Sequence, residues 1–222
     1  MADCEVQGVR VGAVLGGDDR KETRLTLSEY SQRVLENIRA LDEERRNETE
    51  SEKETETRLA ALVEANIQFS FLATNICQPV KLQDCSGSSS FVLYNLARIK
   101  QILRTFDELV TSGHYPPLPA TEHINFSLLA EPEEWELMLT FLLSYQDVVT
   151  DCSNSLSVHK LLAFLCGLAS TFSRYYNRVK ILKDPLPHLI PAVHAKIYFL
   201  KELSSLLVAA LRLLNIKYVD KM

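Results

Sequence analysis

One short stretch of the chain concentrates aromatic and basic side chains. Residues 172–182 read FSRYYNRVKIL and contain two adjacent tyrosines, an amide and three cations: Arg174, Tyr175, Tyr176, Asn177, Arg178 and Lys180. Flat aromatic faces stack on nucleobases and cations attract phosphates, so this combination suits single-stranded nucleic acid. In the alternative interpretation, the tyrosines complete a hydrophobic core and the cations are solvated at a helix end. Composition alone favours that alternative.

The charge of the chain is unevenly distributed. Its 222 residues carry a net charge of −5. Residues 160–222 hold ten Lys or Arg and three Asp or Glu, a charge of +7, whereas residues 1–159 hold 14 bases and 26 acids, a charge of −12. Because phosphate affinity follows local cation density, a basic C-terminal region on an acidic body favours a nucleic-acid partner.

Residue patterns typical of catalysis are missing from the sequence. It has no glycine-rich phosphate loop, no G-x-S-x-G and no H-E-x-x-H. Its five histidines are scattered, without a carboxylate or cysteine at the spacing of metal ligands. We therefore expect no catalytic residues, no metal and no cofactor, and thus a protein that is not an enzyme.

The cysteines and the apolar runs bear on where the protein resides. Five widely spaced cysteines without a C-x-x-C pair predict reduced thiols rather than a disulfide framework. No apolar run is long enough for a membrane span, and the N-terminus lacks the charged-then-apolar pattern of a signal peptide. These features predict a cytoplasmic protein without a membrane partner.

Helical patterns dominate the chain, since glycine is scarce (7 residues) and leucine abundant. The exception is residues 1–27, in which alternating valines, a Gly-Gly-Asp-Asp turn and a second alternating run predict a β-hairpin. Thr26 and Glu29 form a capping box that opens a helix over 27–41. Residues 42–56 contain no apolar residue, which predicts a solvated linker; an acidic segment that docks a partner is the other interpretation.

Further helices are predicted from apolar residues at helical spacing. They cover residues 56–74, 91–112, 156–180 and 190–214, with one beginning at Glu131 and a short one around Asp147. Asn215 is expected to end the last helix in a left-handed conformation. The predicted fold class is therefore all-α: a helical bundle preceded by a small β-hairpin and a charged linker.

The helix that begins at Glu131 carries the clearest start signal. Pro132 lies in its first turn, and glutamates stand where the helix dipole favours negative charge. Its expected apolar face consists of Trp135, Met138, Leu139 and Leu142.

Four motifs occur in an order that resembles a known family. They are Y-N-L-A-R-I at 94–99, F-S-L-L at 126–129 followed by Glu133 and Glu134, L-A-x-x-F-x-x-Y-Y-N at 168–177, and L-L-N-I at 213–216 before Met222. Together they resemble the DALR anticodon-binding domain of arginyl-tRNA synthetases over residues 58–222. Asn95 and Leu96 replace the Ala-His usual in the first motif. A stand-alone, non-catalytic branch of the family shares Asn95, and the chain resembles that branch most.

The N-terminal segment is similar to another part of a synthetase. Residues 11–25 resemble the segment with the lysine-rich signature loop, which helps the ATP step. The lysine pair of that loop is replaced by Arg20-Lys21-Glu22, and neither the nucleotide-binding sheet nor its H-I-G-H motif occurs in this sequence. The resemblance therefore does not support aminoacylation.

The resemblance implies a non-catalytic tRNA-binding adaptor. It would recognise arginine tRNA through residues 58–222 and present it to a methyltransferase that makes 3-methylcytosine in the anticodon loop. Residues 1–27 would be a remnant of the signature-loop segment, and residues 28–57 a helix and charged linker. The residues expected at the tRNA site are Tyr94, Arg98, Arg174, Tyr175, Tyr176, Asn177, Arg178, Lys180, Lys196 and Met222.

Each of these residues has an expected role. Tyr175 and Tyr176 would offer the aromatic surface, while Phe172 stays in the core. The cations on the last two helices would meet phosphates, with Arg178 and Lys180 as the best candidates for direct contact.

Two other functions remain open. One is a protein-interaction module whose DALR fold has lost RNA affinity and docks a partner through residues 27–41 and 42–56. The other is the anticodon-binding fragment of an arginyl-tRNA synthetase that works with a separate catalytic chain.

Overall fold

Helices form most of the chain, as the apolar spacing predicts. The computed structural model describes residues 11–16, 26–43, 52–82, 87–182 and 185–218. The principal helices and strands are β1 (Val14–Gly16), α1 (Leu27–Glu43), α2 (Glu52–Leu72), β2 (Val80–Leu82), α3 (Ser88–Thr111), α4 (Pro132–Glu136), α5 (Tyr145–Ser155), α6 (His159–Arg178) and α7 (Ile190–Leu213). Two short 3-10 turns, Thr121–His123 and Phe126–Leu128, and a π-helix, Leu137–Leu142, complete the set.

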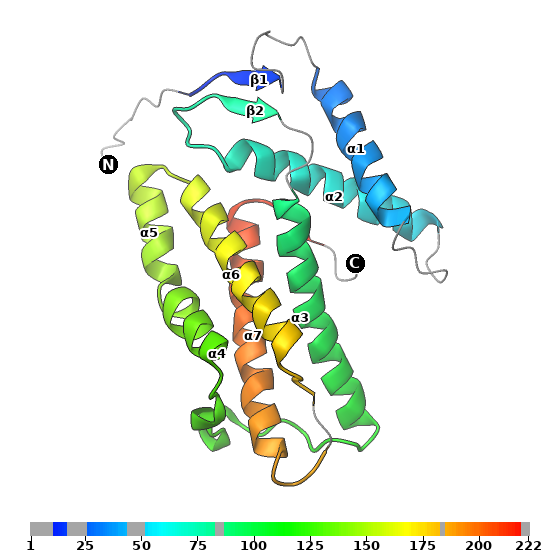
Figure 1. The fold of residues 1–222 in the computed structure, drawn as a ribbon, viewed down its shortest axis with the longest axis vertical. Coiled ribbons are helices and arrows are strands. Elements are labelled where there is room, and N and C mark those ends of the chain that lie inside the picture. The colour runs from blue at the N-terminus through cyan, green and yellow to red at the C-terminus, as the bar shows by residue number, and fades with distance from the viewer. Residues whose placement is uncertain (1–10, 17–25, 44–51, 83–86, 183–184, 219–222) are drawn as a thin grey trace, which may run out of the picture.

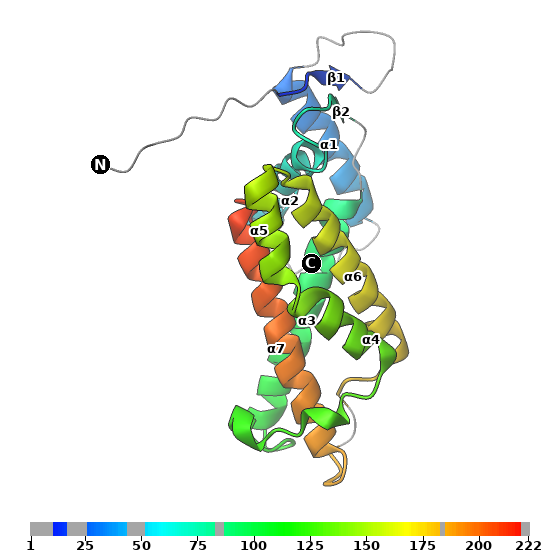
Figure 2. The ribbon, with the colours of Figure 1, turned by 90° about the vertical axis from the view of Figure 1, so that its left-hand side faces the viewer.

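The bundle is built from α3, α6 and α7, with α4 and α5 along one side (Figure 1). Figure 2 shows α4 and α5 following one another along the bundle. Helix α7 contributes the most buried residues, and large side chains of α3 and α6 such as Leu96, Leu165 and Phe172 are fully buried beside it. Removing each from water contributes about 1.5–3 kcal/mol to stability. No helix of the described segments is both long and apolar enough to cross a bilayer.

The first strand has a different partner from the one predicted. β1 lies parallel to β2, with Val14 opposite Val80. A hairpin requires an antiparallel strand directly after the turn, whereas β2 follows α2, and parallel strands need such a long crossover. The second run of the predicted hairpin falls mostly outside the described residues, and it ends at Leu27, which begins α1. The hairpin prediction is therefore wrong for the described strand.

Gly12 allows the chain to approach the turn before β2. Its backbone N–H donates to the carbonyl of Ile76 at 2.8 Å. A Cβ at this position would lie only 2.1 Å from the carbonyl oxygen of Gln78. Any larger residue would therefore push the two segments apart and disturb the strand pair.

Helices α1 and α2 pack against each other at one end of the bundle. The predicted capping box is present: the Thr26 N–H donates to Glu29 Oε2 at 2.7 Å, and the Glu29 N–H donates to Thr26 Oγ1 at 3.3 Å. The Thr26 backbone N–H, and then the Thr26 hydroxyl that also donates to Glu29 Oε2 at 2.9 Å, lower the pKa of the Glu29 carboxyl. Helix α2 begins at Glu52, so the last part of the predicted linker is helical, while residues 44–51 lie outside the described segments.

The helix that starts with α4 changes type after its first turns. In the π-helix Leu137–Leu142, the Leu143 N–H donates to the carbonyl of Met138, five residues back, at 3.0 Å. Leu137 and Phe141 are buried, whereas Trp135 and Leu139 are 48% and 56% exposed. The predicted apolar face is therefore wrong for Trp135 and Leu139.

The last helix ends as predicted. Asn215 adopts a left-handed conformation with φ of 56°. The Ile216 N–H then donates to the carbonyl of Leu211 at 2.9 Å, which satisfies a carbonyl at the end of α7.

Candidate nucleic-acid interface

Two tyrosines and an arginine come together where α3 packs on α6. The guanidinium carbon of Arg98 lies 4.4 Å from the ring centre of Tyr94 and 4.2 Å from that of Tyr176. The Arg98 Nη2 also donates to the Tyr94 hydroxyl at 2.6 Å. Tyr94 and Arg98 are one helical turn apart on α3, and Tyr176 belongs to the last turn of α6. We call these three residues the stacked cluster.

The stacked cluster is open to solvent on the side of Tyr176. The Tyr176 side chain is 37% exposed, and its ring centre lies 6.2 Å from that of Phe172, which is fully buried as predicted. The buried Phe172 ring thus packs against the exposed Tyr176 ring and supports it from the core side. A fixed aromatic ring beside a guanidinium is suited to stack a nucleobase next to its phosphate. Asn177, the next residue, is also exposed.

Tyr175 lies in the core. Its side chain is fully buried, and its hydroxyl donates to Glu134 Oε1 at 2.6 Å. Burial first, and then this hydrogen bond, raise the pKa of the phenol. The prediction that Tyr175 offers aromatic surface to RNA is therefore wrong, because no face of its ring reaches solvent.

Lys196 is also buried and cannot meet a phosphate. Its Nζ lies 3.5 Å from Glu134 Oε1 and 6.0 Å from the ring centre of Tyr175. The other oxygen of Glu134 accepts the backbone N–H of Glu131 at 3.0 Å. Glu134, Tyr175 and Lys196 form a buried triad that joins α4, α6 and α7. The triad explains the burial of Lys196, since a buried charge needs a partner.

Arg174 and Arg178 are exposed, but both are bound to carboxylates of the α4 segment. Arg174 Nη2 donates to the two oxygens of Glu136 at 2.9 and 3.0 Å. Arg178 Nε donates to Glu133 Oε1 at 3.0 Å, and its Nη2 donates to Glu131 at 2.7 Å. The hydrogen bond from Arg178 lowers the pKa of Glu133, and the two glutamates raise the pKa of Arg178. We call Glu131, Glu133 and Glu136 the α4 carboxylates.

Lys180 is the remaining predicted cation. It is exposed and contacts no acidic side chain among residues that the structure describes. Met222 lies outside the described residues, so its predicted place at the site stays a prediction. Of the four cations predicted to meet phosphates, Lys180 alone is both exposed and unpaired within the described segments.

In the folded protein, acidic side chains from elsewhere in the chain neutralise part of the positive charge of the basic C-terminal region. At least five of its ten cations pair with acids that come from residues 1–159: Lys160, Arg174, Arg178, Lys196 and Lys217. The sequence marks the α4 carboxylates only as an acidic helix start. Nothing local in the sequence indicates their contact with α6, because the partners lie 38 to 47 residues apart.

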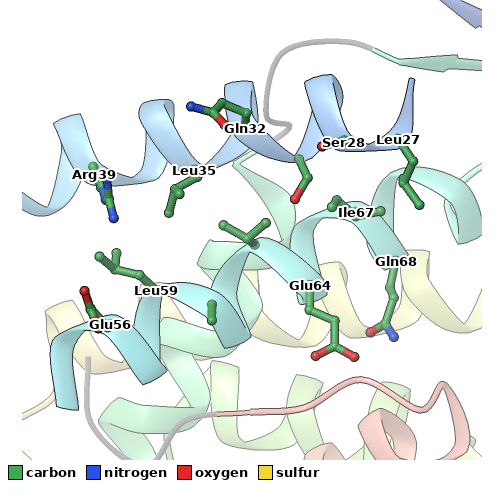
Figure 3. Close-up of a pocket in the computed structure, with 13 residues that line it drawn as sticks. Leu27, Ser28, Gln32, Leu35, Arg39, Glu56, Leu59, Glu64, Ile67 and Gln68 are labelled. Carbon is green, nitrogen blue, oxygen red and sulfur yellow. The ribbon is translucent and has the colours of Figure 1, made fainter. Parts of the chain in front are cut away.

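A separate groove runs between α1 and α2, with a volume of about 860 Å³. Figure 3 shows Leu35 and Leu59 pointing into it from the two helices, with Arg39 and Glu56 at one end. It shares no residue with the stacked cluster. The described residues contain no group of three His, Cys, Asp or Glu side chains that could hold a metal ion.

The fold is that of the helical C-terminal region of an aminoacyl-tRNA synthetase. The arginyl-tRNA synthetase of Thermus thermophilus superimposes with a TM-score of 0.71 at 23% identity, over 95% of this chain and 34% of that one. Residues 92–222 match the model of the DALR anticodon binding domain, and the chain belongs to this family. The stacked cluster and the predicted cations all lie within the matched residues.

Relatives of two kinds are similar in sequence. DALR anticodon-binding domain-containing protein 3 of Danio rerio is 29% identical over 184 residues, 74% of this chain and 33% of the relative. The arginine–tRNA ligase of Prochlorococcus marinus (strain NATL2A) is 30% identical over 199 residues, 83% of this chain and 31% of the ligase. The chain thus spans about a third of the length of these relatives.

Proposed function

We propose that this chain is a non-catalytic module that binds the anticodon arm of arginine tRNA through the face formed by α3 and the end of α6. The stacked cluster carries the proposal, because it presents an exposed, supported aromatic ring beside a guanidinium inside a DALR domain. In this arrangement a base stacks on Tyr176, Arg98 stays beside it, and Lys180 meets a phosphate. Residues 58–222 form the binding unit.

The site is tested by measuring the affinity of the natural chain and of its Arg98→Ala variant for an arginine tRNA transcript. We expect the variant to lower affinity about ten-fold, since it removes both the guanidinium and the group that orients the two rings. Arg212→Ala is the matched control, because Arg212 is an exposed arginine on α7 outside the cluster. Equal affinities of the natural chain and the Arg98 variant would place the RNA elsewhere.

We further propose that the bound tRNA is presented in the cytoplasm to a methyltransferase that makes 3-methylcytosine. Support comes from the similarity to stand-alone DALR proteins and from the missing catalytic motifs. Cells that lack the protein should lose 3-methylcytosine from arginine tRNA, and re-expression of the natural chain should restore it. If the Arg98→Ala variant also restored 3-methylcytosine, the modification would not depend on the proposed tRNA site.

The groove between α1 and α2 favours a second candidate function, a protein-interaction module without RNA affinity. Leu27 at its edge is 64% exposed, and apolar side chains line it. This function predicts that the chain retains no tRNA and that Leu27→Glu removes a protein partner. Salt-sensitive tRNA binding by the full chain excludes it.

The sequence similarity to an arginine–tRNA ligase supports a third candidate function, that of an anticodon-binding fragment that works with a separate catalytic chain. Addition of this chain to a synthetase that lacks its own anticodon-binding domain would then raise arginylation. No increase would exclude that role.

A further inference from the structure

The α4 carboxylates occupy the two arginines of α6 much as phosphates would. Glu136 places both of its oxygens on Arg174, and Glu131 and Glu133 together engage Arg178. An arginine fork recognises a phosphate through paired N–H groups such as Nε and Nη2 of Arg178, and Arg174 holds its carboxylate through Nη2 alone. An RNA phosphate that takes Nη2 of Arg174, or Nε and Nη2 of Arg178, must therefore displace a carboxylate.

The carboxylates are held in place by the interior of the protein. Glu134, in the middle of the same segment, is fully buried and bound by Tyr175 and Lys196. Glu134 also accepts the N–H of Glu131, which fixes the start of α4. The α4 segment therefore stays beside the arginines, and its acids are present whenever RNA approaches.

We propose that the α4 carboxylates are internal competitors for RNA phosphate and thereby set the selectivity of the RNA site. The inference rests on the proposed tRNA binding. An RNA that offers only phosphates must break these ion pairs and gains little, because one charge partner replaces another. An RNA that also places a base on Tyr176 gains stacking that the carboxylates do not oppose. The segment thus suppresses binding of unrelated RNA more than binding of the cognate tRNA.

The triple variant Glu131→Gln, Glu133→Gln, Glu136→Gln tests the proposal. It keeps the shape and the hydrogen-bond acceptors of the segment but removes its charge. With two arginines free, the logarithm of the affinity for a mixed-sequence single-stranded RNA should fall more steeply with salt, by about 1.4 in slope. At low salt, that affinity should rise about ten-fold, and the affinity for arginine tRNA should rise less.

A matched control separates competition from net charge. Glu108, Glu122 and Glu202 are exposed and form no ion pair within the described residues, so their change to Gln alters the total charge equally. This control variant should leave the ratio of the two RNA affinities within two-fold of the natural chain. An equal gain in the control and in the triple variant would overturn the proposal.

The arginines provide a second measurement. Arg174→Gln with Arg178→Gln should lower RNA affinity less in the natural chain than in the triple variant, because the carboxylates hold Nη2 of Arg174 and both Nε and Nη2 of Arg178 in the natural chain. In the triple variant the same change should cancel the ten-fold gain. A ten-fold gain that persists in the triple variant after the loss of both arginines would show that the carboxylates do not act by occupying them. Absence of tRNA binding by the natural chain would instead reject the proposed function itself.

Discussion

Tyr175 and Tyr176 are neighbours in sequence and lie in opposite environments. Tyr175 is fully buried against Glu134, in a triad that joins three helices. Tyr176 is 37% exposed and lies over Arg98 on α3. A helix turns by about 100° per residue, so adjacent side chains cannot share a face. One tyrosine belongs to the scaffold of the domain and the other to its surface.

The two environments divide stability from binding. The buried triad couples charged groups away from water, where loss of one partner leaves the others uncompensated. The stacked cluster is partly exposed to solvent, so its loss should change the free energy of unfolding little. The same loss removes the ring on which a base of the RNA would stack. Substitutions at the triad should therefore change the free energy of unfolding, and substitutions at the stacked cluster should change the affinity for tRNA.

The largest effect is expected from Glu134→Ala. It strands the Lys196 ammonium in the core and removes the acceptor of the Tyr175 hydroxyl, which should cost about 3–5 kcal/mol of unfolding free energy. Urea denaturation followed by circular dichroism measures it. Asp151→Ala is the control, since Asp151 forms an exposed pair with Lys160 whose loss should cost less than about 1 kcal/mol. Equal losses would contradict the division.

Tyr176→Ala should act on binding. Loss of one stacked base costs about 1–3 kcal/mol of binding free energy, or about 5- to 150-fold in the affinity for arginine tRNA. Fluorescence anisotropy with a labelled anticodon stem-loop measures this change. Tyr176→Trp should retain affinity because it keeps a flat ring. Binding equal to that of the natural chain would remove Tyr176 from the interface.

Tyr175→Phe is the counterpart of that experiment. It removes only the hydroxyl that bonds to Glu134 and should cost about 1.5 kcal/mol of unfolding free energy. The tRNA affinity should stay unchanged at a temperature where both proteins are folded. A variant that keeps its stability and loses tRNA would reverse the roles assigned to the two tyrosines.

The smallest effect is expected from Lys180→Gln. If Lys180 meets one phosphate, its loss should reduce the salt dependence of tRNA binding by about 0.7 in slope. Binding isotherms at several salt concentrations measure the slope. Lys160→Gln, which removes a cation paired with Asp151, should leave it unchanged. The same slope for both variants would remove the special role of Lys180.

The sequence predicts most of the fold because the signals are local. Apolar residues at helical spacing locate the long helices, and Thr26 with Glu29 and Asn215 mark two of the ends. The burial of Tyr175 was also within reach, since it continues the apolar stripe of Leu168 and Phe172, whereas Tyr176 falls one residue off it. Composition alone assigns the two tyrosines together, because it does not say which way each side chain points.

The remaining differences come from contacts between distant segments. The parallel pair of β1 with β2, and the ion pairs of Arg178 with Glu131 and Glu133, join residues that no local pattern relates. A charge count along the chain therefore overestimates the positive charge of the domain surface. In our proposal, selectivity for RNA arises because the α4 carboxylates, which are distant in sequence, pair with the arginines of α6 in the folded protein.

The π-helix between α4 and α5 has a consequence for how the chain tolerates changes in length. A turn closed by a five-residue hydrogen bond contains one residue more than an α-helical turn. Deletion of one residue within Leu137–Leu142 would turn the wide turn into an α-helical one, and the helical segments on its two sides would keep their relative orientation. Deletion of the exposed Leu139 should therefore be far less damaging than deletion of one residue in the regular helix α6, where the following side chains would rotate by about 100°.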